Sequence, residues 1–195
     1  AGGWSHDKLW SKLPRLQRFV LTGQADLSFD VTGLDARVPK LESLELKSGA
    51  CLTVRGQLVR PMSSLSFAAK EDLALDCELP ATTFSFSLSG RRLTRAPRLG
   101  REHSSLSVQL EQPHERDMEE LLSGVHHVRA MHFRGMPIDE HTVVRLVKRL
   151  EPDYIDIVDT GIGEAAVRKI AALFPAMRMH PWYADESSTE APTRH

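Results

Sequence analysis

A nine-residue pattern of apolar residues recurs along the chain and constrains its fold more than any other feature. The pattern places apolar residues at its first, fourth, seventh and ninth positions. Four segments match it in full, at 13–21, 38–46, 59–67 and 125–133. Self-similarity of this kind is the signature of a repeat protein, in which each repeat buries its apolar side only against its neighbours. The chain is therefore expected to fold as a stack of similar units.

Weaker copies of the pattern keep only its last two apolar positions. The final residues of all copies, full and weak, form the series 21, 46, 67, 88, 110, 133, 157 and 179. Successive members lie 21 to 25 residues apart. The copies near 84–88 and 106–110 can each be placed in two ways that differ by two residues, because alternation continues through both segments. The series predicts short strands that stack in parallel, one per repeat.

The chain resembles the leucine-rich-repeat proteins, and the C-terminal third resembles their ribonuclease-inhibitor-like type most closely. The residues that carry this resemblance are Tyr154 to Gly163, followed by apolar residues at helical spacing as far as Pro175. The resemblance covers residues 13 to about 180, although 68–117 match only through their alternating pairs. It implies an α/β solenoid with a curved parallel sheet and helices on the convex side, mainly in the C-terminal repeats. It also implies protein binding, and it transfers no catalytic residue.

The spacing of apolar residues predicts where the chain returns from one strand to the next by a helix. Residues 139–150 and 164–173 each place apolar side chains on one helical face, and Asp139 is a suitable N-cap for the first of them. A shorter helix is expected near 115–123. Between 68 and 117, prolines and glycines punctuate the chain and predict extended or irregular return segments instead.

The expected organisation is one repeat domain with a short segment at either end. Residues 1–12 are expected to cap the first repeat, with a short helix over 5–12 that begins at Ser5. The repeat domain is expected to span 13–183, with Trp182 and Tyr183 covering its last repeat. Residues 184–195 are polar and rich in Ser and Thr, which predicts a disordered tail.

Composition narrows the classes of partner. The chain has 25 Lys and Arg against 26 Asp and Glu, for a formal net charge of -1, so it has no global field that would attract nucleic acid or an anionic membrane. No apolar run approaches the roughly 20 residues that cross a bilayer. Two cysteines are too few for a disulfide scaffold of this length, and no signal peptide is evident, so a cytoplasmic protein is expected.

Residues between the paired apolar positions of each strand are the candidates for binding. Alternation along a strand turns them away from the core and onto the exposed, concave side of the sheet. The residues at these positions are Val20, Glu45, Ser66, Ser87, Gln109, His132, Asp156 and Arg178, and further outward positions are Lys47, Arg134, Val158 and His180. The residues predicted to contact a partner are His132, Arg134, Asp156, Arg178, His180, Glu45 and Gln109.

No pattern of residues points to chemistry. The nine histidines share no spacing typical of metal ligands, and no nucleophile, phosphate-binding or dinucleotide-binding motif is present. The sequence therefore predicts neither a metal nor a cofactor, and a protein that is not an enzyme. The favoured function is a module that binds a partner protein, or another domain, through the concave sheet. The alternatives are a structural spacer within a larger protein and an enzyme without a recognisable motif.

Overall fold

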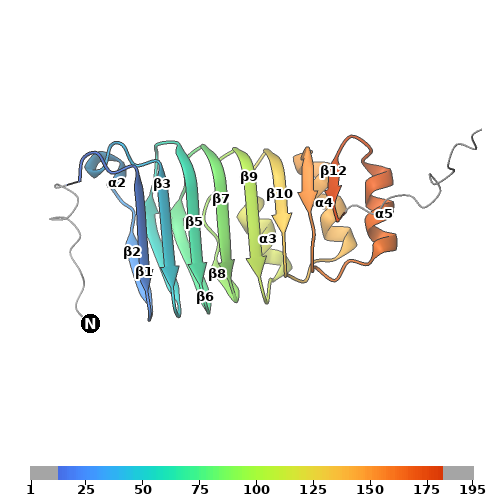
Figure 1. The fold of residues 1–195 in the computed structure, drawn as a ribbon, viewed down its shortest axis with the longest axis horizontal. Coiled ribbons are helices and arrows are strands. Elements are labelled where there is room, and N and C mark those ends of the chain that lie inside the picture. The colour runs from blue at the N-terminus through green and yellow to red at the C-terminus, as the bar shows by residue number, and fades with distance from the viewer. Residues whose placement is uncertain (1–12, 182–195) are drawn as a thin grey trace, which may run out of the picture.

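The largest element of the fold is an eight-stranded sheet, seen in the computed structural model that describes residues 13–181 (Figure 1). Its strands are, in spatial order, β1 (Arg18–Gly23), β3 (Ser43–Ser48), β5 (Met62–Ala69), β7 (Thr82–Gly90), β9 (Glu102–Leu110), β10 (His127–Phe133), β11 (Tyr154–Asp156) and β12 (Arg178–His180). Every neighbouring pair is parallel, which confirms the predicted α/β fold with parallel pairing of equivalent strands. The predicted caps at 1–12 and 182–183 and the tail at 184–195 lie outside the described residues.

A second parallel sheet runs behind the N-terminal half of the first. Its strands, in order, are β2 (Leu27–Asp30), β4 (Leu52–Gln57), β6 (Asp72–Glu78) and β8 (Arg92–Arg95). The sequence analysis expects extended return segments in the middle of the chain but does not foresee that they form an ordered sheet. The reason for the order is alternation, because Leu73, Leu75 and Cys77 on β6 are all buried.

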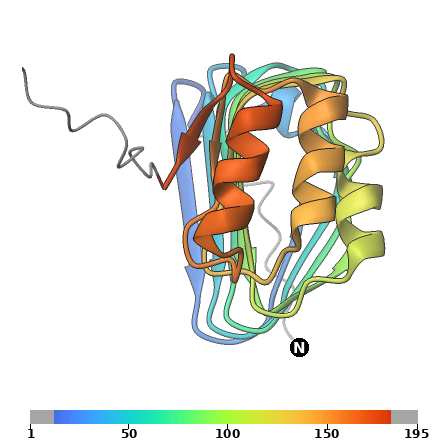
Figure 2. The same cartoon turned by 90° about the vertical axis from the view of Figure 1, so that its right-hand side faces the viewer.

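Helices form the return segments of the C-terminal repeats and confirm the predicted positions. They are α3 (Glu115–Leu122), α4 (Glu140–Leu150) and α5 (Glu164–Leu173), and a single turn, α2 (Leu34–Arg37), occurs near the other end. The Asp139 carboxylate caps α4 by accepting a hydrogen bond of 2.7 Å from the Thr142 backbone N–H. Figure 2 shows the three longer helices and the second sheet on the same side of the eight-stranded sheet. The other side of that sheet, the outer face, is left uncovered by these elements.

The core fills the space between the eight-stranded sheet and the layer of helices and strands behind it. Parallel register aligns one inward residue from each successive strand, and this row is fully buried. Its members are Leu44, Leu65, Phe86, Leu106, Met131 and Ile155. Burying one such side chain stabilises a fold by about 1.5–3 kcal/mol, so the rows dominate stability. The rings of Phe67 on β5 and Phe86 on the neighbouring β7 pack edge to face, with their centroids 6.0 Å apart.

Two of the predicted strand positions are wrong by two residues. On β9 the residues equivalent to Phe86 and Leu88 are Leu106 and Val108, not Val108 and Leu110. On β12, Met179 pairs with Ile155 and so begins its pair instead of ending it. A slip of two residues preserves the alternation, so every outward residue keeps its face.

The slip on β9 has a cause in the sequence. Where full copies of the pattern have an apolar residue, β7 has Thr83 and β9 has His103, which pair with each other in register. Both residues are buried. Because a polar residue stands at this position, the first part of the nine-residue pattern cannot be recognised in the sequence. The register of the strand can then be predicted only from the alternation of apolar residues, which allows a shift of two residues.

We predict that Leu44→Ala and Glu45→Ala differ sharply in their effect on the free energy of unfolding. Leu44 is fully buried, so its truncation is expected to destabilise the fold by about 2–5 kcal/mol. Glu45 faces outward and pairs with exposed cations, so its truncation is expected to reduce stability by less than about 1 kcal/mol. Urea melts of the two variants measure both values. A more damaging Glu45→Ala would reverse the inward and outward assignments.

Candidate binding face

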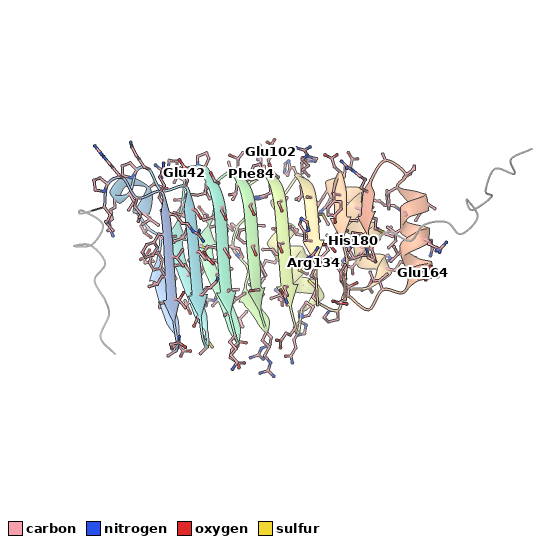
Figure 3. The ribbon with its side chains drawn as sticks, in the orientation of Figure 1. Glu42, Phe84, Glu102, Arg134, Glu164 and His180 are labelled. Carbon is pink, nitrogen blue, oxygen red and sulfur yellow. The ribbon has the colours of Figure 1, made fainter. Side chains whose placement is uncertain are left out.

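The outer face consists of three rows of side chains that run across the strands in register. The first row contains Arg18, Ser43, Ser64, Ser85, Ser105, Ala130, Tyr154 and Arg178. The second contains Val20, Glu45, Ser66, Ser87, Ser107, His132, Asp156 and His180. The third contains Thr22, Lys47, Ala68, Ser89 and Gln109, with Arg134 and Val158 following at the ends of β10 and β11. Figure 3 views this face, with Arg134 and His180 labelled toward its C-terminal end.

Serine occupies the centre of the outer face. The serine field comprises Ser43, Ser64, Ser66, Ser85, Ser87, Ser89, Ser105 and Ser107. These side chains come from β3, β5, β7 and β9 and are all partly exposed. Sequence reasoning identifies only Ser66 and Ser87 among them. The side chains of the serine field are small, polar and uncharged. The charged residues of the outer face lie on either side of this field, at the N-terminal and C-terminal ends of the sheet.

At the N-terminal end, one carboxylate is held between two cations. The Glu45 carboxylate accepts hydrogen bonds from Arg18 and lies in ion pairs of 2.9 Å with Arg18 and 2.6 Å with Lys47. The hydrogen bond from Lys47, followed by that from Arg18, holds the pKa of Glu45 below its ordinary value. The Glu45 side chain is 17% exposed, whereas those of Arg18 and Lys47 are 68% and 50% exposed. The exposed charged groups at this end of the outer face are therefore mainly the cations.

At the C-terminal end, four of the predicted residues form the Asp156 cluster: His132, Arg134, Asp156 and His180. Asp156 lies at its centre and is fully buried. Its Oδ2 accepts a hydrogen bond from Nε of Arg134, at 2.5 Å, and forms an ion pair with Nη2 of the same guanidinium. Nδ1 of His132 lies 3.6 Å from Oδ2, and Nδ1 of His180 lies 3.4 Å from Oδ1. The Val158 backbone N–H donates to Oδ1 at 3.3 Å.

The charge of Asp156 is retained in spite of its burial. Burial is the largest influence and raises the pKa of Asp156. The hydrogen bonds from Arg134, Val158 and His180, together with the Arg134 charge, outweigh it and hold the pKa below its ordinary value. The same pair raises the pKa of Arg134. The cluster is therefore an ionised carboxylate beneath a fixed guanidinium.

Asp156 itself does not meet the prediction that it is exposed to a partner. Its carboxylate sits on the outer side of the sheet, but the longer side chains of Arg134, His132 and His180 cover it completely. It accepts hydrogen bonds from Arg134 and His180 and lies 3.6 Å from Nδ1 of His132. Arg134 and His180 are 60% and 50% exposed and His132 is 27% exposed, so they remain available to a partner.

The remaining predicted residues lie beside or far from the cluster. Arg178 is exposed on β12 opposite Tyr154, whose ring centroid is 5.5 Å from that of His132. Gln109 is exposed and follows Val108, which pairs with Phe133, so it lies beside Arg134. Glu45 lies at the opposite end of the sheet, beyond β5, β7 and β9. The structure thus separates the seven predicted residues into one group of six and one outlier.

Chemistry other than binding has little support in the geometry of the site. Within 13–181, no three His, Cys, Asp or Glu side chains are grouped so that they could hold a metal ion. The thiol of Cys77 is buried, and burial raises its pKa to about 12, which makes it a poor nucleophile. None of the described helices has the length and apolar character needed to span a membrane. What the cluster offers is hydrogen-bond donors and positive charge.

We predict that Asp156 makes the wild-type fold more sensitive to acid than an Asp156→Asn variant. A carboxylate whose pKa is lowered by folding contributes stability above the pKa of the unfolded chain, about 4, and loses it as the pH falls through the folded pKa. Thermal melts between pH 5 and pH 3 should therefore show the wild type losing Tm relative to the variant. Parallel curves over this range would mean that Asp156 carries no lowered pKa.

We also predict strong energetic coupling between Arg134 and Asp156. A double-mutant cycle with Arg134→Gln and Asp156→Asn measures this coupling from urea melts. The matched control is the pair Arg95 and Asp76 on the second sheet, where both side chains are more than half exposed. The Arg134–Asp156 coupling should exceed the control by at least about twofold, because burial of one partner reduces solvent screening. Equal couplings would show that the buried carboxylate does not fix the guanidinium.

Comparisons with known proteins leave the family open. No protein-family model, curated protein or solved structure matches the chain. The resemblance to leucine-rich repeats therefore rests on the sequence itself, through the repeat spacing and residues 154–175, and it enters below as a proposal.

Proposed function

We propose that this chain is a leucine-rich-repeat solenoid that binds a partner protein, or another domain, through its outer face and catalyses no reaction. The observation that carries the proposal is the Asp156 cluster. A fully buried carboxylate holds the Arg134 guanidinium and lies within 3.6 Å of two imidazole nitrogens, on a face that the helices and the second sheet leave uncovered. Polar groups held in place before binding lose less freedom when a partner arrives.

The distribution of residues over the outer face also favours binding over a spacer role. Most residues of the three rows are polar or charged, and the charges gather at two ends of an uncharged centre. A spacer needs only a soluble surface and has no use for a buried carboxylate beneath that surface. Both cysteines are unpaired, which suits a reducing compartment, and we place the protein in the cytoplasm.

An enzymatic function has one feature in its favour and two against it. Ser107, His132 and Asp156 are neighbours in one row, and this order of residue types is that of a hydrolytic triad. However, the Asp156 Oδ2 that faces His132 accepts hydrogen bonds from Arg134, and it lies 3.6 Å from Nδ1 of His132. The row also lies on the face of a paired sheet, whose backbone N–H groups bond to neighbouring strands instead of an oxyanion.

A cavity elsewhere is equally poor in reactive groups. It has a volume of about 610 Å³ and lies at the N-terminal ends of α3, α4 and α5. Asp139 and Thr142, which line it, bond to each other as the cap of α4. Thr160 donates its hydroxyl to the Ile157 carbonyl. These groups stabilise the fold, so the outer face is the better supported functional surface.

We predict that a photo-cross-linking amino acid placed at Ser87 captures a defined partner in extract of the source cells. The matched control carries the same amino acid at Arg95, which is exposed on the second sheet, away from the outer face. Adducts are expected at Ser87 and not at Arg95. Adding Arg134→Glu should reduce the Ser87 adducts, because it reverses a charge at the C-terminal end of the same face. Equal adducts from the two positions, or none from either, would contradict binding through the outer face.

A further inference from the structure

We propose that the outer face selects an extended acidic segment of a partner, which crosses the serine field and places carboxylates at both of its charged ends. This inference rests on the proposed function and names the chemistry of the partner. It depends on three properties of the outer face: its net charge, the distance between its charged ends, and the hydroxyl groups between them.

The outer face is cationic although the chain as a whole is not. Its three rows contain four cations, Arg18, Lys47, Arg134 and Arg178, and two carboxylates, Glu45 and Asp156, which leaves a net charge of +2 before any histidine is protonated. The whole chain has a formal net charge of -1. Both carboxylates lie beneath cations, so the exposed charge is positive at both ends. Charge complementarity therefore calls for an anionic partner.

The separation of the two ends fits a short extended peptide. Lys47 is on β3 and Arg134 follows β10, four steps apart in the sheet. At about 4.8 Å per step the two cations lie about 19 Å apart, which an extended chain covers in about six residues. Three strands separate the two ends, and their outward residues in the first two rows are all serines, so these rows leave a path without a large side chain.

The serine field can satisfy the backbone of such a peptide. A serine hydroxyl both donates and accepts hydrogen bonds, so it can bond to a peptide N–H or C=O in either orientation. Eight hydroxyls in register offer these bonds without adding charge. Side chains between the two acidic anchors of the ligand should be small, because short serine side chains beneath them bring the ligand backbone close to the sheet.

The anchors are better suited to carboxylates than to the phosphates of a nucleic acid. One of the five N–H groups of the Arg134 guanidinium donates to Asp156, so the others can bond to an approaching oxygen anion. Nucleic acid affinity depends on neutralising many phosphates, and the rows offer only four cations. An acidic peptide needs only one or two contacts at each end.

The test uses fluorescent peptides and the full-length chain. The probe is EESGSGSEE, in which two acidic pairs are separated by small residues. Its controls are QQSGSGSQQ, without charge, and GSEEEESGS, with four adjacent acidic residues. Residues 182–195 contain Asp185, Glu186 and Glu190, which could compete for the same face. Each titration is therefore repeated with Asp185→Asn, Glu186→Gln and Glu190→Gln combined, so that competition in cis cannot conceal binding.

We predict that the spaced acidic probe binds at least about tenfold more tightly than the uncharged one and about threefold more tightly than the clustered one. Fluorescence anisotropy at low salt measures this, and high salt should weaken the binding. Lys47→Gln and Arg134→Gln should each weaken it about three- to tenfold, whereas Arg95→Gln should leave it unchanged. Ser87→Tyr should weaken only the spaced probe, because it obstructs the path between the ends.

Two results would overturn the inference. The first is equal affinity for the acidic and uncharged probes in both tail backgrounds. The second is a Lys47→Gln variant that folds, by circular dichroism, and binds the spaced probe as the wild type does. Either result would leave the proposed function standing if the cross-linker at Ser87 still captures a partner that Arg95 does not. Loss of the Ser87 adducts would instead remove the proposed function itself.

Discussion

In-register parallel pairing between equivalent strands is the constraint on which the rest of the structure depends. It places Leu44, Leu65 and Phe86 in one buried row and, one residue later, Glu45, Ser66 and Ser87 in one outward row. The apolar rows hold the stack together by burial. The outward rows contribute little to that stability, so core packing does not restrict their residues and they can take the role in recognition that we propose. The core and the outer face are thus two consequences of one register.

The two charged ends of the outer face use the same arrangement with different degrees of burial. Glu45 and Asp156 each hold cations toward solvent, but Asp156 is fully buried and both accepts a hydrogen bond from and forms an ion pair with one guanidinium. Long cationic side chains otherwise lose considerable rotamer freedom when they bind. Fixing Arg134 in advance moves that loss from binding to folding, where the apolar rows offset it.

Periodicity was sufficient to predict the parallel sheet, the helices over 140–150 and 164–173, and the grouping of His132, Arg134, Asp156 and His180. It could not reveal that Asp156 is buried, because the cover comes from the length of neighbouring side chains instead of their spacing. The second sheet was missed because its strands are short and alternate like those of the first. Ser107 was missed because His103 obscures the repeat on β9, and the other serines of the field were missed because they flank the outward position between each apolar pair.

The cations in the three rows give the outer face a positive charge that the chain as a whole does not have. With +2 in the outer rows and a formal total of -1, the remainder of the chain has a net charge of -3. Such a field turns the molecule during diffusion, so an acidic partner approaches the outer face more often than chance allows, and association is faster at low ionic strength. The same field opposes the meeting of two outer faces, which disfavours self-association through the surface that we propose for recognition.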